Sequence, residues 1–165
     1  LYGPGVGEGG VRAAGVSVLG GLIRTWELQA GRVDHALAMA LPSSVQRRGP
    51  VWPAISEDGF AAQSYAGPIP LGSLFAIPVS VDLNSLGLSP VGLAVATAMQ
   101  RYGVYDMDSA GGMVFYAETS AEPLVGQLRA DVGKIASQLR VVVNNTRTSP
   151  SGGGTALAPL APALR

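Results

Sequence analysis

The chain has 165 residues, of which 47 % are hydrophobic and 13 % are charged, with 11 basic residues balancing 11 acidic ones. A neutral chain lacks the long-range field that draws proteins onto nucleic acid or anionic membranes. The absence of cysteine excludes disulfides, thiolate metal sites and a cysteine nucleophile. The length suffices for one domain with a substantial core. Because a weakly charged, neutral surface favours association, we expect a homo-oligomer or a larger assembly.

The two ends differ in composition from the middle. Residues 1–21 are glycine-rich and indicate an N-terminal arm, residues 148–165 form a low-complexity Gly/Ala/Pro tail, and residues 22–147 are expected to be the compact domain. The apolar runs are too interrupted to span a bilayer. The chain starts at Leu1 without a leader pattern, which suggests a processed product or a fragment. Leucines spaced along the tail are expected to dock on a neighbouring subunit: Leu157, Leu160 and Leu164.

The first predicted strand is "HALAMALP", residues 35–42, in which large and small apolar side chains alternate. One face carries Leu37, Met39 and Leu41, and the other carries Ala36, Ala38 and Ala40. Both faces are apolar, so we expect a buried strand with a second layer packed against the alanines. An alanine-rich helix is the alternative, and Pro42 argues against it.

A second alternating segment covers residues 74–82, after a Pro/Gly-broken loop at 47–60. Its predicted core face is Phe75, Ile77, Val79 and Val81. Pro78 cannot donate to a strand ladder, so this strand is expected at a sheet edge or at a bulge.

Helix signals follow in "LSPVGLAVATAMQRYG", residues 88–103. Ser89 is a predicted N-cap, Pro90 suits the first helical position, and Gly103 suits the C-terminal cap. A second helix is expected from Ser120 onward. The apolar stripes are Val91, Val95, Met99 and Tyr102 in the first helix, and Leu124, Leu128, Val132, Ile135 and Leu139 in the second.

The segments 104–108 and 113–118 are expected to form a hairpin around "SAGG", and residues 139–145 are expected to close the domain as a strand. The predicted fold class is therefore mostly β with two helices (α+β). Its expected core is β-sandwich-like or jelly-roll-like and decorated by helices.

His35 is the only histidine in the chain. As a catalytic candidate it needs an orienting group, and adjacent strand residues point to opposite faces, which excludes Asp34. The structural alternative is a half-buried histidine that bonds to the backbone or to a carboxylate such as Asp82 or Asp108. A single histidine without cysteine argues against a structural zinc site.

The acidic stretch "DMDSAGG", residues 106–112, resembles the start of a calcium loop. Asp106, Asp108 and Gly111 fall at positions 1, 3 and 6 of an EF-hand, but Ala110 and Ala117 stand where oxygen ligands are required. We therefore reject an EF-hand. An irregular Ca²⁺ site at Asp106 and Asp108 stays open, and no other cofactor is expected.

Acids and aromatic residues suggest a carbohydrate site. Hydrolysis of a glycosidic bond uses two carboxyl groups roughly 5–9.5 Å apart. The candidate acids are Glu57, Asp58, Asp82, Asp106, Asp108 and Glu118, and the large polar-tipped aromatics are Trp26, Trp52, Tyr65, Tyr102, Tyr105 and Tyr116. The catalytic candidates are His35, the only histidine, together with Asp82 and Asp108. The ligand-binding candidates are Trp52, Asp58 and Tyr65. The alternative is that most of the aromatics belong to the core or its boundary.

Several phrases occur in a characteristic order: "GGLIRTWEL", "GRVDHALAMALP", "VWPA" with "DG", "PIPLGSLFAIPVSVD", and "LGLSP" with "AMQRYGVYDMDS". Over residues 20–118 they resemble a β-rich module of large bacterial secreted or surface proteins and of phage tail or fibre-associated proteins. The matching positions are Arg24, His35, Trp52-Pro53-Ala54, Asp82, Tyr102-Gly103 and Asp108. The resemblance implies a β-sandwich-like module that follows an N-terminal half of a parent protein, and it implies no particular reaction.

These observations favour a non-enzymatic structural or adhesion module of a bacterial surface or phage particle. Its terminal arms would pack on neighbouring subunits, and its location would be extracellular, at a cell surface or in a virion. The alternative is a glycan-binding or glycan-hydrolysing domain that uses exposed aromatics and paired carboxylates. If the chain is an enzyme, a glycoside hydrolase or another polysaccharide-active enzyme is expected. No nucleic-acid partner is expected.

Overall fold

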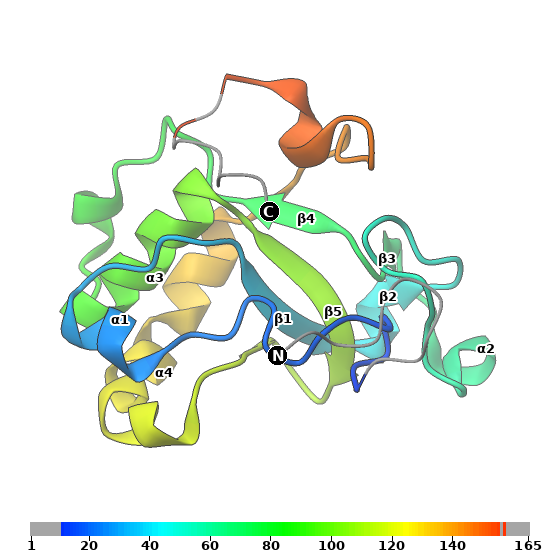
Figure 1. Ribbon diagram of the computed structural model, residues 1–165, viewed down its shortest axis with the longest axis horizontal. Coiled ribbons are helices and arrows are strands. Elements are labelled where there is room, and N and C mark those ends of the chain that lie inside the picture. The colour runs from blue at the N-terminus through cyan, green and yellow to red at the C-terminus, as the bar shows by residue number, and fades with distance from the viewer. Residues whose placement is uncertain (1–10, 156, 158–165) are drawn as a thin grey trace, which may run out of the picture.

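The computed structural model describes residues 11–155 and 157. These residues form a mixed α/β fold (Figure 1). The α-helices are α1 (Thr25–Gln29), α2 (Ala61–Ser64), α3 (Pro90–Arg101) and α4 (Glu122–Gln138). The strands are β1 (Leu37–Pro42), β2 (Gln46–Arg47), β3 (Ile69–Pro70), β4 (Leu74–Ala76), β5 (Val104–Ala110), β6 (Val114–Phe115) and β7 (Arg140–Val141).

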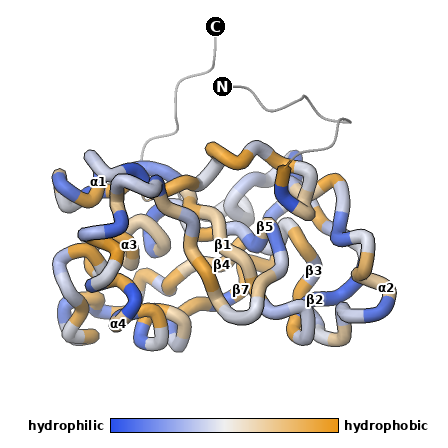
Figure 2. Tube along the Cα trace, turned by 90° about the horizontal axis from the view of Figure 1, so that it is seen from below, coloured by the Kyte–Doolittle hydropathy of each residue, from blue (hydrophilic) through white to orange (hydrophobic). Residues whose placement is uncertain are grey.

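Five strands make one mixed sheet in the order β6-β1-β5-β4-β7, and β2 pairs with β3 in a separate parallel pair. β1 runs parallel to β5 and antiparallel to β6, while β4 runs antiparallel to β5 and β7. Helices α1, α3 and α4 lie to one side of the molecule, and β2, β3 and α2 lie to the other (Figures 1 and 2). The sheet therefore separates a helical half from a half built mainly of loops.

The alternating strand is confirmed in β1, whose first five residues are all buried. Leu37, Met39 and Leu41 belong to the core cluster that α3 and α4 complete. Ala38 belongs to a second cluster, formed by three alanines with Leu71 and Met107, against which tyrosines including Tyr65 and Tyr116 pack. The layer expected over the alanines is thus present. It is built from loops and the segment before α1, with Ala38 N donating to the Gly21 carbonyl at 3.0 Å.

The two long predicted helices are confirmed. Ser89 Oγ accepts from Gly92 N at 3.0 Å at the start of α3, and Pro90 is its first residue. Gly103 has a φ of +82° just after the helix end, the conformation that a glycine cap supplies without steric cost. In α4, Leu128 and Ile135 of the predicted stripe are fully buried against the same core.

The predicted hairpin between residues 104–108 and 113–118 is wrong. β5 and β6 do not pair with each other, because β1 lies between them and pairs with both. A strand that is apolar on both faces is most stable inside a sheet, with a neighbour on each side.

The segment 74–82 is a strand only as far as Ala76, because Pro78 begins a turn in which Val81 N donates to the Pro78 carbonyl at 3.0 Å. β4 lies between β5 and β7 and is not an edge strand. Val79, expected in the core, is 71 % exposed. The last predicted strand shortens to β7. A sandwich or jelly-roll arrangement is not confirmed.

The segment 11–21 packs on the sheet. Ala14 is fully buried, and its amide donates to the Met107 carbonyl at 3.1 Å. The remainder of the expected arm, residues 1–10, lies outside the described residues, as do Leu160 and Leu164 of the expected tail. Leu157 is described and is exposed. Among the helices that the structure describes, none combines the length and hydrophobicity needed to cross a bilayer.

Candidate functional site

Five polar side chains converge at the C-terminal end of β5 and form what we call the Ser109 cluster: Asp58, Tyr65, Asp108, Ser109 and Tyr116. Ser109 Oγ donates to Asp58 Oδ2 at 2.7 Å, and Ser109 N donates to Asp108 Oδ1 at 3.0 Å. Two carboxylates, fifty positions apart in the chain, are therefore bound to one residue. These two contacts keep the carboxyl groups within the upper limit of roughly 9.5 Å used by glycosidases.

The loop around α2 shapes the Asp58 side of the cluster. The Asp58 carbonyl accepts from Ala61 N at 3.0 Å, and Tyr65 N donates to the Ala61 carbonyl at the other end of this short helix. The turn brings the Tyr65 hydroxyl back to Asp58 Oδ2, to which it donates at 2.6 Å. Burial, followed by the hydrogen bond to Asp58, raises the pKa of Tyr65 above its ordinary value. The phenol is thus held in its neutral, donating form.

A β-bulge shapes the Asp108 side. Along the β1–β5 pair, Met39 lies opposite Asp106 and Ala40 lies opposite Asp108, so Met107 is the additional residue. A bulge changes the direction in which the next side chains point. Asp108 Oδ2 accepts from the Tyr116 hydroxyl at 3.2 Å. Burial, followed by the charge of Asp108, raises the pKa of Tyr116 to about 12.

Arg12 contributes the nearest described positive charge. Its guanidinium lies over the Tyr116 ring, 4.2 Å from the centroid, and its terminal nitrogens donate to the carbonyls of Gly20 and Val18. Burial lowers the pKa of Arg12, and the neighbouring Tyr116 and Asp108 oppose that effect. Arg12 therefore fixes the segment before α1 beneath the cluster and offsets part of its negative charge.

A fully buried pair lies behind the cluster. Gln46 Nε2 donates to both carboxylate oxygens of Asp106, at 3.1 and 3.0 Å, and to the Asp108 carbonyl at 2.8 Å. Neither Gln46 nor Asp106 is exposed. Burial raises the pKa of Asp106 to about 7; the hydrogen bond from Gln46 opposes this shift, and the charge of Asp108 adds to it.

The chemistry available at the cluster is hydrogen-bond acceptance. An ionised carboxylate only accepts, with about four lone-pair sites, so Asp58 and Asp108 keep capacity after binding the groups above. Hydroxyl donors from a ligand would complete these sites through charge-assisted hydrogen bonds. Asp58 and Asp108 both accept hydrogen bonds from their described neighbours, which suits binding better than the acid–base division that hydrolysis requires.

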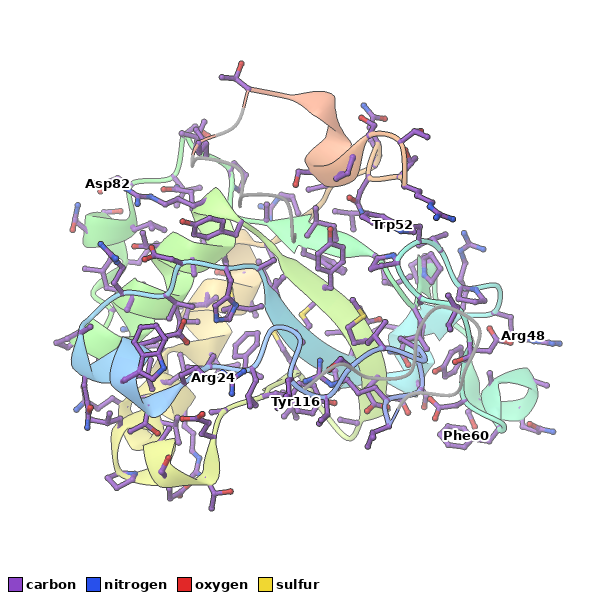
Figure 3. The ribbon with its side chains drawn as sticks, in the orientation of Figure 1. Arg24, Arg48, Trp52, Phe60, Asp82 and Tyr116 are labelled. Atoms are coloured by element: carbon purple, nitrogen blue, oxygen red, sulfur yellow. The ribbon has the colours of Figure 1, made fainter. Side chains whose placement is uncertain are left out.

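The other two catalytic candidates lie elsewhere. His35 Nε2 is 3.0 Å from Glu27 Oε1, and His35 Nδ1 is 2.8 Å from the Ala36 carbonyl. The structure thus agrees with a half-buried histidine bonded to the backbone and to a carboxylate, but the carboxylate is Glu27 and not Asp82 or Asp108. Asp82 is exposed and accepts from Asn84 N at 3.0 Å at the start of a short 3₁₀ turn. Figure 3 places Asp82 at the opposite end of the molecule from Phe60.

Among the ligand-binding candidates, Asp58 and Tyr65 are joined, and Trp52 is separate. The Trp52 ring meets the edge of Tyr105, with centroids 6.4 Å apart, and is half-buried. Phe60, two positions after Asp58, is 49 % exposed. In Figure 3, Trp52 and Phe60 lie at different heights of the same half of the molecule. Phe60 is therefore the exposed aromatic residue adjacent in the chain to the cluster.

The calcium alternative gains no support from this geometry. Within residues 11–155 and 157, no group of three or more acidic or histidine side chains is placed to hold a metal ion. Gln46 takes both oxygens of Asp106, and Asp108 is engaged by Ser109 and Tyr116.

Sequence reasoning missed Ser109, Gln46, Arg12 and Phe60 as members or neighbours of the site. Ser109 stands between an aspartate and an alanine, and Gln46 follows a valine; neither context carries a distinguishing signal. A local signal did exist for Phe60, since it follows "DG" and precedes a polar helix. Phe60 was not among the expected aromatics because phenylalanine has no polar tip.

The described cavities lie away from the cluster. One, of about 320 Å³, separates the 31–34 loop from α3, and another, of about 700 Å³, lies between β6 and α4. As criteria for a binding site, cavity size and converging polar groups therefore identify different parts of the described structure. We take the Ser109 cluster as the candidate site because it supplies directed polar groups. No protein-family model, curated protein or solved structure matches this chain.

Proposed function

We propose that the protein is a non-enzymatic adhesion module of a bacterial surface or phage particle that binds glycan hydroxyl groups at the Ser109 cluster. The observation that carries the proposal is the bridge from Asp58 through Ser109 to Asp108, with a tyrosine hydroxyl on each carboxylate. Sugars present adjacent hydroxyl donors, and a pair of oriented carboxylates accepts them well.

An exposed aromatic residue two positions after Asp58 in the chain supports the same proposal. Phe60 exposes about half of its surface beside Asp58 in the chain, and an exposed ring offers the apolar CH face of a sugar a contact surface. The balanced charge of the chain supports a neutral ligand over a polyanion. A location outside the cell, on the cell surface or in a virion, belongs to this proposal.

The test is binding to an array of bacterial cell-wall polysaccharides with matched variants. Asp58→Asn and Asp108→Asn keep side-chain size and remove charge, and each should weaken binding about tenfold or more, the value of a hydrogen bond to a charged group. Phe60→Ala should weaken it less. Asp82→Asn is the control because that exposed carboxylate caps a distant turn. Equal binding by all variants would overturn the proposal.

The same array distinguishes binding from hydrolysis. Release of reducing ends that stops in both Asp58→Asn and Asp108→Asn would replace the adhesion role with glycoside hydrolysis. Binding without release of reducing ends supports adhesion.

A second role in assembly is favoured by the cavity between β6 and α4. Its lining is mainly apolar and includes side chains from the sheet edge and from the helix: Ile23, Met113, Val114, Phe115, Val125 and Val132. Val114 is 42 % exposed on an edge strand. We propose a second copy of this chain as the occupant, because a chain with zero net charge does not repel itself.

Light scattering on the eluting full chain tests assembly. Val114→Lys should shift an oligomer toward monomer, whereas Val79→Lys, at another exposed valine, should not. A monomeric full chain at high concentration would remove the assembly role and leave glycan binding unaffected.

A further inference from the structure

Gln46 joins the two parts that carry the Ser109 cluster. Its backbone belongs to β2, and its carbonyl accepts from Gly67 N at 2.7 Å, close to Tyr65 in the chain. Its side chain crosses to β5 and donates there to Asp106 and to the Asp108 carbonyl. One buried amide thus ties the loop half, which holds Asp58 and Tyr65, to the strand that holds Asp108.

The contacts of Gln46 span the bulge. Asp106 and Asp108 lie on the two sides of Met107, the additional residue of β5. Gln46 holds Asp106 by its side chain and Asp108 by its backbone, and both contacts come from the same Nε2. The direction of the Asp108 side chain follows from the backbone of this bulge.

We propose that Gln46 and Asp106 form a buried positioning pair that sets the orientation of Asp108, so that the proton on Asp106 controls glycan binding at the Ser109 cluster. The proposal rests on the proposed function for its ligand. Gln46 and Asp106 are fully buried and do not touch the ligand, and they act through Asp108.

Two arrangements of hydrogen bonds follow from the donors present. With Asp106 ionised, Gln46 Nε2 is the donor, and Gln46 Oε1 has no partner among the described residues. With Asp106 protonated, its hydroxyl needs an acceptor, and Gln46 Oε1 supplies one when the amide turns over. That turn withdraws Nε2 from the Asp108 carbonyl and releases the bulge.

The groups around Asp106 place the change between its ionised and protonated forms near neutral pH. Burial raises the pKa of Asp106 to about 7, and Asp108 faces it from the same strand as a like charge. The tyrosines that face it, Tyr65 just after α2 and Tyr116 just after β6, stay neutral because burial raises their pKa values. Arg12, from the segment before α1, faces Asp108 and not Asp106 directly. Ionised Asp106, and with it the binding arrangement, therefore prevails above pH 7.

The amide of Ser109 reports the orientation of Asp108 without any ligand, because Ser109 N donates to Asp108 Oδ1. In ¹⁵N-labelled full chain titrated from pH 5.5 to 8.5, we expect the Ser109 amide signal to shift with a midpoint near 7. Asp106→Asn removes the titratable carboxyl group and should abolish this transition, while Asp82→Asn should preserve it. Affinity for soluble cell-wall polysaccharide should fall about tenfold from pH 8 to 5.5 in the unaltered chain and stay constant in Asp106→Asn.

A transition near pH 7 that survives in Asp106→Asn, or that is missing from the unaltered chain, would overturn the positioning role. If Asp106→Asn does not fold, Gln46→Met provides the same check, because without Nε2 the Ser109 amide should keep its low-pH signal throughout. An intact amide transition with no polysaccharide binding at any pH would remove glycan binding and leave the coupling of Asp106 to Asp108 established.

Discussion

Glu27 and His35 face each other across the turn after α1, with Oε1 of the buried carboxylate 3.0 Å from Nε2 of the ring. Glu27 also accepts from Arg24 N at 2.8 Å, so one side chain closes the start of the helix and holds the residue that precedes β1. His35 has the Ala36 carbonyl at its other ring nitrogen. The only histidine of the chain is thus a structural link between α1 and the sheet.

His35→Leu should therefore destabilise the protein without changing ligand binding. The substitution leaves Glu27 buried with one donor fewer, which costs about 1–3 kcal/mol. Urea unfolding measures the loss, and Asp34→Asn is the matched control because Asp34 is exposed and pairs with the exposed Arg32. A fully stable His35→Leu protein with lost polysaccharide binding would instead place His35 in the functional site.

Asp106→Asn should raise stability at pH 8 and not at pH 4.5. Burial in the folded protein raises the pKa of this acid from its ordinary value of 3.8 to about 7. Between these values the folded state holds a proton that the unfolded state has lost, so the contribution of Asp106 to stability falls as pH rises from about 4 to 7. Above pH 7, ionised Asp106 lowers the free energy of unfolding by on the order of 1–4 kcal/mol, since one pKa unit corresponds to about 1.4 kcal/mol.

Urea unfolding of both proteins at pH 4.5, 6 and 8 measures this difference, and comparing the two cancels the titration of the other acids. A stability difference that is the same at all three values would show that Asp106 does not titrate between them.

Gly72→Ala should be far more damaging than Gly49→Ala. Both glycines have positive φ, +89° and +83°, so both substitutions carry a backbone cost of about 1–2 kcal/mol. An added Cβ at Gly72 would lie 1.8 Å from the Val51 carbonyl oxygen, whereas nothing lies within 4 Å of one at Gly49. Gly72 N also donates to the Asp106 carbonyl, so a shift there disturbs the site. Thermal unfolding compares the two, and equal losses would contradict this packing.

The sequence was informative wherever the signal was local. Ser89, Pro90 and Gly103 mark the ends of α3 by the chemistry of their own backbone groups, and the alternation in residues 36–41 identifies β1. Strand partners are chosen by the whole sheet, so the nearness of residues 104–108 and 113–118 in the chain led to a hairpin that β1 replaces.

The same limit applies to the site. Asp58, Tyr65 and Asp108 were candidates by residue type, but their meeting at Ser109 depends on the α2 turn and on the bulge in β5. The bulge follows from pairing with β1 in another part of the chain, and the sequence around Met107 does not mark it. Glu27 was absent from the expected partners of His35, although it lies only eight positions earlier in the chain, because the sequence does not show how the turn after α1 folds back.

The order of the strands also bears on how the molecule is made. β1 leaves the ribosome before both of its neighbours, β5 and β6, which are encoded more than sixty residues later. A growing chain that has not reached Val104 carries β1 as an apolar strand with neither edge paired. Such a strand tends to associate with other chains. Until β5 and β6 have been synthesised, β1 must therefore be protected from other chains, or their synthesis must follow quickly.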